Sequence, residues 1–108
     1  MPFQVEITRK AFLDAEEAYI WFSEQSAQWA ERWLKGLLEA VNSLEELPTR
    51  CAVVQEGRVL EKEIRQYLYG RGRTSYRLFF EIRGDTVFIL RIRHGTRKPI
   101  TSAEIAED

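Results

Sequence analysis

The sequence predicts an α+β fold with the element order β-α-α-β-β-β, in which an antiparallel sheet packs against an N-terminal helical hairpin. Three observations lead to this class. The chain begins with a short alternating segment, continues with two stretches of helical periodicity, and then carries three strand-like segments separated by glycine-containing turns. At 108 residues, we expect a single domain spanning residues 1–108.

The N-terminal half predicts one strand and two helices. Residues 3–7 alternate apolar and polar side chains, which is typical of a strand with one buried face. Residues 11–23 place apolar side chains three and four positions apart, and residues 27–47 do so more regularly until Pro48 ends the helix. The break between the two segments is short, so we expect an antiparallel helical hairpin.

The C-terminal half predicts three strands, at residues 64–69, 74–82 and 86–94. The first two are separated by the sequence GRGR, and the last two by Gly84-Asp85, a typical hairpin turn. We therefore expect an antiparallel meander, with the first strand of the chain joining an edge of the same sheet. A short helical turn or a loose tail is expected at the acidic C-terminal end.

Positive charge is concentrated in this C-terminal region, although the net charge of the chain is only -1. Residues 1–63 hold 12 acidic and 7 basic side chains, whereas residues 64–100 hold 2 acidic and 9 basic side chains. Such separation indicates a polyanionic or acidic partner. The alternative is a solvated strand face on which arginine side chains cover apolar neighbours.

The last hairpin brings two candidate catalytic residues together if its turn has two residues. Arg77 then lies opposite Ile92 and diagonal to His94, on the same side of the sheet. If residues 70–73 form a four-residue loop, Arg65 lies opposite Leu78. That places it on the side of the sheet that carries Arg91.

This cluster has the chemistry needed to cut RNA. Guanidinium groups bind phosphate through paired hydrogen bonds and a permanent charge, and a histidine can donate a proton to a leaving oxygen near neutral pH. We therefore expect Arg77 and His94 as catalytic residues, although a lone histidine is often only a hydrogen-bonded surface residue. Contacts to RNA or another target are expected from Arg65, Arg71, Arg73, Arg91, Arg93, Arg97 and Lys98.

Other classes of site receive no support. Cys51 is the only cysteine and His94 the only histidine, so no intramolecular disulfide is possible and no metal-ligand spacing is present. No segment approaches the roughly 18 consecutive apolar residues that a membrane span needs. We expect no metal, no cofactor and no membrane partner, and a cytoplasmic location.

Three stretches of the sequence carry a family resemblance: EIRQYLYGR at 63–71, YRLFFEIRGDTVFILRIRHGTRKP at 76–99, and LEELPTRC at 44–51. Together with the element order, they resemble the RelE/ParE superfamily, the toxins of bacterial type II toxin–antitoxin systems. The resemblance extends over nearly the whole chain. It implies a cognate antitoxin as partner.

The resemblance implies two alternative activities. One branch of the superfamily cleaves messenger RNA on the ribosome, and the other poisons DNA gyrase without cleaving anything. Arg77 matches the strand arginine that nuclease members use on the scissile phosphate, and His94 matches a late catalytic position in some of them. We expect first a ribosome-dependent mRNA endonuclease, and as the alternative a gyrase-poisoning toxin. An inactive member that only binds antitoxin is a third possibility.

Overall fold

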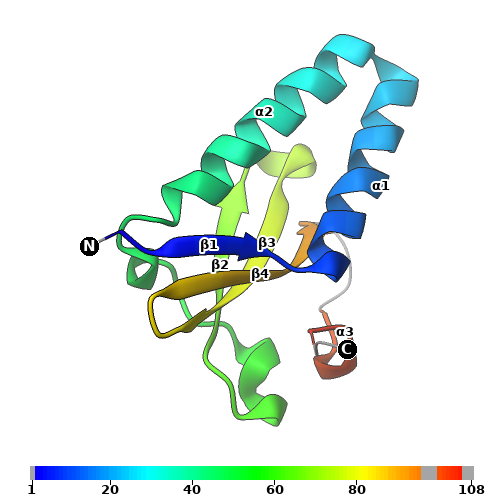
Figure 1. Cartoon of the computed structure of the whole chain (residues 1–108). Helices are drawn as coiled ribbons and strands as arrows, with labels where there is room; N and C mark the ends of the chain where they lie inside the picture. Colours follow the sequence, from blue (N-terminus) through cyan, green and yellow to red (C-terminus); the bar gives the residue numbers. More distant parts are fainter. Residues whose placement is uncertain (1, 96–99, 106–108) are drawn as a thin grey trace.

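The computed structural model describes residues 2–95 and 100–105 and confirms the predicted α+β class (Figure 1). A helical hairpin covers one face of a four-stranded sheet, and a short C-terminal helix lies on the opposite side. The main elements are β1 (Gln4–Ile7), α1 (Arg9–Gln25), α2 (Ala27–Ser43), β2 (Ile64–Tyr69), β3 (Tyr76–Arg83), β4 (Thr86–His94) and α3 (Ser102–Ile105).

The two long helices begin at hydroxyl side chains that cap their free N–H groups. Thr8 Oγ1 accepts a hydrogen bond from Ala11 N–H at 3.3 Å, and Ser26 Oγ accepts one from Trp29 N–H at 3.3 Å. The Thr8 hydroxyl also donates to the Ile89 carbonyl at 2.8 Å, which fixes the start of α1 on β4. Among the described residues, no helix has the length and apolar content to cross a membrane.

The sheet has the strand order β1-β4-β3-β2 and is mixed, which corrects the fully antiparallel prediction. The meander of β2, β3 and β4 is antiparallel as expected, and β1 lies at an edge as expected, but β1 runs parallel to β4. Just after β1, Thr8 N–H donates to Ile89 O at 3.1 Å. This bond continues the parallel pairing up to the point where the chain enters α1.

The pairing of β3 with β4 follows the predicted register only as far as Phe80. There a β-bulge leaves Leu90 without a partner on β3. Beyond the bulge, Arg77 faces Arg93 instead of the predicted Ile92. Because side chains alternate between the two faces of a strand, this shift of one residue exchanges the faces for the rest of β4.

The turn between β2 and β3 is also longer than predicted. Tyr69 faces Tyr76, so six residues rather than four separate the paired positions, and Arg65 faces Phe80 instead of Leu78. A shift of two residues keeps every side chain on its predicted face. Arg65 nevertheless does not share a face with Arg91 as expected, because the bulge in β4 moves Arg91 to the other side.

Both faces of the sheet are covered, each by its own apolar cluster. The main core lies under the helical hairpin and contains Trp33, Leu37, Leu78, Phe80, Ile89 and Ile92 among others. A smaller second-face cluster consists of Ile64, Phe79, Leu90, Ile100 and Ile105. The C-terminal segment contributes two of these five side chains, so it is a packed part of the domain rather than a loose tail.

The Glu104 carboxylate fixes this C-terminal segment and makes it sensitive to acid. It accepts hydrogen bonds from Thr101 N–H at 3.0 Å and from Arg93 Nη1 at 2.5 Å, and these bonds lower the pKa of Glu104 from 4.5 to about 2. A lowered pKa means that the stabilisation is complete above the ordinary value of 4.5. It is lost as the pH falls from there through the pKa of about 2 in the folded protein.

We therefore expect the methyl NMR signals of Ile105 to shift between pH 5 and pH 2 as α3 loosens, before the domain unfolds. Glu104→Gln is expected to make the position of these signals independent of pH over this range. Glu63→Gln, at a side chain that is 69% exposed, serves as the matched control and keeps the wild-type response. An unchanged titration in Glu104→Gln would contradict this assignment.

Candidate functional site

Arg77 and His94 lie on opposite faces of the sheet, so the predicted convergence of these two residues is wrong. Arg77 Nε donates to Gln66 Oε1 at 2.6 Å, and its Nη2 lies 3.0 Å from Glu56 Oε2. His94 lies on the face covered by the helices, where its ring meets that of Tyr76 edge to face at 5.2 Å between centroids. The bulge in β4 is the physical cause. The catalytic role proposed for each residue stays a prediction.

Arg91 is held by the most extensive ion pair of the described residues. Its Nε and Nη2 contact the two Asp14 carboxylate oxygens at 2.7 and 2.9 Å, and its Nη1 donates to the Glu104 carbonyl at 2.9 Å. Asp14 also accepts a hydrogen bond from Ile92 N–H at 3.0 Å. The bond to Asp14 raises the pKa of Arg91 above its ordinary value. This arginine therefore connects α1, β4 and α3 and is not available to an external phosphate.

Two further arginines of the predicted set also have partners inside the domain. Arg93 pairs with Glu104, and its Nε is buried without a hydrogen-bond partner among the described residues. Arg65 donates to the Cys51 carbonyl at 2.6 Å and pairs with Glu63 at 2.9 Å. Both guanidinium groups therefore stabilise the loops and the C-terminal segment around the sheet.

Arg71 and Arg73 differ from these residues because both are exposed at the turn between β2 and β3. Gly70 and Gly72 have φ values of +90° and +57°, a backbone conformation that favours glycine and shapes this turn. The other two predicted contact residues, Arg97 and Lys98, lie outside the described residues. Within the part of the chain that is described, the turn at 70–75 thus carries the accessible members of the predicted set.

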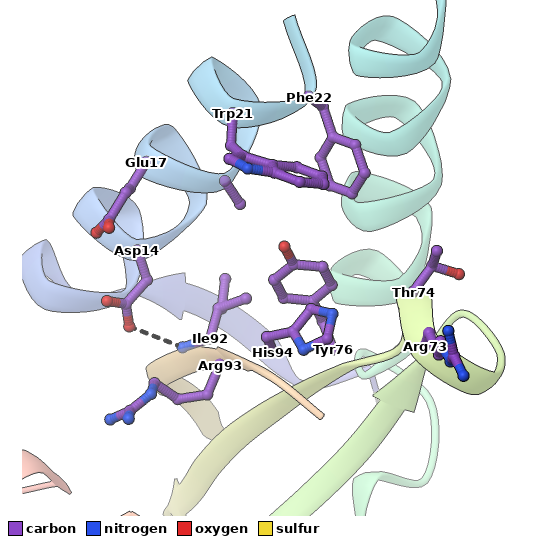
Figure 2. Close-up of a pocket in the computed structure, with 11 residues that line it drawn as sticks. Asp14, Glu17, Trp21, Phe22, Arg73, Thr74, Tyr76, Ile92, Arg93 and His94 are labelled. Carbon is purple, nitrogen blue, oxygen red and sulfur yellow. Dashed lines mark hydrogen bonds between the residues drawn. The ribbon is translucent and has the colours of Figure 1, made fainter. Parts of the chain in front are cut away.

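A cavity of about 400 Å³ opens beside this turn, between α1 and the ends of β3 and β4 (Figure 2). Trp21 and Phe22 on α1 face Tyr76 and His94 on the strands across it. Its lining consists of Asp14, Glu17, Ala18, Trp21, Phe22, Arg73, Thr74, Tyr76, Ile92, Arg93 and His94. The cavity thus brings together three predicted site residues, Arg73, Arg93 and His94, whereas Arg77 is on the other side of the sheet.

Sequence reasoning missed the contribution of α1 to this cavity. Phe12 belongs to the apolar repeat of residues 11–23, yet its side chain is 57% exposed, and the buried residues of α1 are Ala11, Ala18 and Phe22. Two small alanines on the inner face allow α1 to approach the sheet closely. The available signal was the excess of apolar residues on α1, including Trp21, over the number that one buried face accommodates.

The chemistry of the cavity favours binding. One rim carries the acidic Asp14 and Glu17, the other carries Arg73, and aromatic rings form the walls. Among the residues described, no group of three or more His, Cys, Asp or Glu side chains is placed to hold a metal ion. Two aromatic walls and opposed charges suit an amphipathic guest such as a protein side chain.

One comparison with known proteins identifies the family of this chain. The family model described as the ParE toxin of the type II toxin–antitoxin system parDE matches residues 5–99. Among solved structures, the chain is similar to one from the chromosomal ParDE TA system of P. aeruginosa, with a TM-score of 0.67 and 21% sequence identity. That likeness covers 85% of this chain and 95% of the other, and at this identity it shows the fold alone. No curated protein matches the chain.

Proposed function

Because the chain belongs to the ParE toxin family of type II toxin–antitoxin systems, we propose that it acts by binding DNA gyrase and cleaves no nucleic acid. It is a type II toxin, and its partner is a cognate antitoxin. The proposal concerns the cellular target of the toxin. From the sequence, cleavage of mRNA on the ribosome was the first expectation and poisoning of gyrase the alternative. The superfamily has a branch that poisons gyrase without cleaving nucleic acid, and the proposal assigns the chain to this branch.

One observation carries the proposal: the arginines expected to build a nuclease site are engaged within the domain. Arg77, Arg91 and Arg93 each pair with a carboxylate, with closest distances of 3.0, 2.7 and 2.5 Å. A phosphate would have to displace these carboxylates, whose removal from a partly buried cation is costly. The opposite placement of Arg77 and His94 further argues against their acting on the same phosphate.

The direct test uses the purified toxin with purified gyrase and, separately, with a translation extract. We expect inhibition of DNA supercoiling and intact mRNA in the extract. Addition of the cognate antitoxin is expected to restore supercoiling. Cleaved mRNA together with unaffected supercoiling would contradict the proposal and support the nuclease alternative. Absence of both effects would indicate the inactive member considered above.

The variants Arg77→Gln and His94→Gln address the catalytic hypothesis itself. We expect both to arrest growth as strongly as wild type when expressed without antitoxin, provided that their thermal unfolding shows a folded protein. Removal of a general acid or of a group that stabilises transition-state charge typically costs about 10²–10⁴-fold in rate. Loss of toxicity on that scale by a folded variant would show that these residues act in catalysis.

The exposed turn gives a prediction for target binding. We expect Arg71→Glu with Arg73→Glu to weaken gyrase inhibition by about tenfold, because reversed charges at an interface slow association and repel the partner. The matched control is Arg32→Glu with Lys35→Glu, which makes the same change in net charge on exposed positions of α2. Equal loss of inhibition in both double variants would show that only the overall charge matters.

A further inference from the structure

The C-terminal segment, residues 100–105, covers the second face of the sheet without being joined to a strand through its backbone. Among the described residues, its backbone–backbone hydrogen bonds stay within the segment, from the N–H groups of Glu104 and Ile105 to the Thr101 carbonyl. α3 has only four residues, which is too short for a helix to be stable without packing. The segment is therefore held on the sheet by contacts that involve side chains, as a bound peptide would be.

Two apolar side chains anchor this segment. Ile100 and Ile105 are only 4% and 2% exposed, and they belong to one cluster with Ile64, Phe79 and Leu90. The last three residues come from β2, β3 and β4, so the second face presents apolar side chains from three neighbouring strands. A segment that replaces residues 100–105 must therefore supply two apolar side chains to keep this face covered.

Glu104 completes the attachment through two oxygen atoms. Its Oε2 accepts a hydrogen bond from Arg93 Nη1 at 2.5 Å, and its backbone carbonyl accepts one from Arg91 Nη1 at 2.9 Å. The Arg93 side chain is only 12% exposed, so departure of Glu104 leaves a largely buried cation without this carboxylate, which is costly. A replacement segment must therefore also carry an acidic group. Nucleic acid would supply the negative charge, but its phosphates and riboses offer no apolar cover for Phe79 and Leu90.

We propose that the second face of the sheet is a binding site for an acidic, apolar segment of a partner protein, and that the C-terminal segment occupies this site as an exchangeable ligand. The partner segment places two branched apolar side chains and one carboxylate where Ile100, Ile105 and Glu104 now lie. It displaces residues 100–105 while the rest of the domain stays folded. This inference is independent of the gyrase proposal. We call the site the second-face platform, defined by Ile64, Phe79, Leu90, Arg91 and Arg93.

The test titrates the full-length protein with a synthetic peptide that has the sequence of residues 100–108. Methyl NMR signals of Leu90 report binding at the second-face platform, and those of Leu38, which is 46% exposed on α2, serve as an internal control. In the wild-type protein the attached segment competes at an effective concentration that is roughly millimolar. Glu104→Lys, at a side chain that is 38% exposed, repels Arg93 and is expected to let the peptide bind at least about tenfold more tightly than to wild type.

Controls separate release of the segment from overall charge. Glu39→Lys makes the same charge change at an exposed position of α2, and we expect the peptide to bind this variant as weakly as wild type. Equal tightening in Glu39→Lys and Glu104→Lys would mean that only charge matters, and the proposal would be wrong. Ile105→Asp opens the segment by loss of an apolar anchor. If thermal unfolding shows both opened variants to be folded and neither shifts the Leu90 signals with peptide, the proposal is overturned.

A second comparison tests the chemistry of the partner. Two peptides of otherwise unrelated sequence keep isoleucine at the first and sixth positions and carry glutamate or lysine at the fifth. We expect the glutamate peptide to bind the Glu104→Lys protein about tenfold more tightly, and Arg93→Gln added to that protein to abolish this preference. Arg71→Gln, at the exposed turn, is the matched control and keeps it. A preference that survives Arg93→Gln would contradict the proposal. A wild-type dimer that Glu104→Lys dissociates in sedimentation would make a second copy the occupant and overturn it.

Discussion

Phe80→Ala is expected to lower the free energy of unfolding by about 3–5 kcal/mol. The Phe80 side chain is completely buried on β3 beneath the helical hairpin, in the main core with Leu78 and Ile89. Its removal loses the transfer free energy of the ring and leaves a cavity that the rigid sheet cannot close. Because domains of this size are stable by only about 5–15 kcal/mol, chemical denaturation should show a large shift in midpoint.

Phe79→Ala provides the matched comparison, since Phe79 is the adjacent residue, equally buried, and belongs to the second-face cluster. We expect this variant to release the C-terminal segment before global unfolding, because α3 has only four residues and packs on that small cluster. Limited proteolysis should therefore cleave Phe79→Ala near Ile105 under conditions in which Phe80→Ala, while folded, resists. Identical cleavage of both variants would mean that the two faces unfold as one unit.

Asp14→Ala is expected to lower the free energy of unfolding by about 2–4 kcal/mol. The substitution leaves the Arg91 guanidinium without its paired acceptor and also removes the acceptor of Ile92 N–H. Both Arg91 and Asp14 side chains are largely buried, at 17% and 13% exposure, so water replaces the lost bonds only in part. Thermal and denaturant unfolding measure the effect.

The control for Asp14→Ala is Glu63→Ala. Glu63 also pairs with an arginine, Arg65, but its side chain is 69% exposed, so we expect a loss of only about 0–1 kcal/mol. A similar loss in both variants would show that burial does not determine the strength of these ion pairs. A double variant of Asp14 and Arg91 that is more stable than Asp14→Ala would confirm that the cost comes from the unpaired cation.

The sequence predicted the elements of the fold well because their signals are local. The repeat of apolar residues along α2 and the turn at Gly84-Asp85 each act within a few residues. The end of α2 was predicted less well, since the helix ends at Ser43 and not at the predicted stop before Pro48. The parallel direction of β1 has no local signal, since it depends on pairing with β4, which lies about 80 positions further along the chain. The direction of β1 relative to β4 was therefore known only from the three-dimensional structure.

The candidate site was predictable only in its residue types. A run of arginines and one histidine indicated a site for an anionic group. The faces of the sheet that these residues occupy depend on a β-bulge, however, and the alternation of side chains does not show where a bulge lies. Some carboxylate partners lie far away in the sequence, as with Asp14 and Arg91, which are 77 positions apart. The accessible pair at Arg71 and Arg73 was among the predicted residues, and its place in the GRGR turn is the signal that separates it from the arginines of the strands.

Because β3 is buried on both faces, its second face is exposed for part of the time during synthesis on the ribosome. Synthesis proceeds from the N-terminus, so all four strands and the helical hairpin leave the ribosome before Ile100 and Ile105 do. During that interval Phe79 and Leu90 have no cover from the C-terminal segment, and the nascent domain exposes an apolar strip that chaperones recognise. A transcript broken shortly before codon 100 would thus yield a product prone to aggregation and rapid degradation.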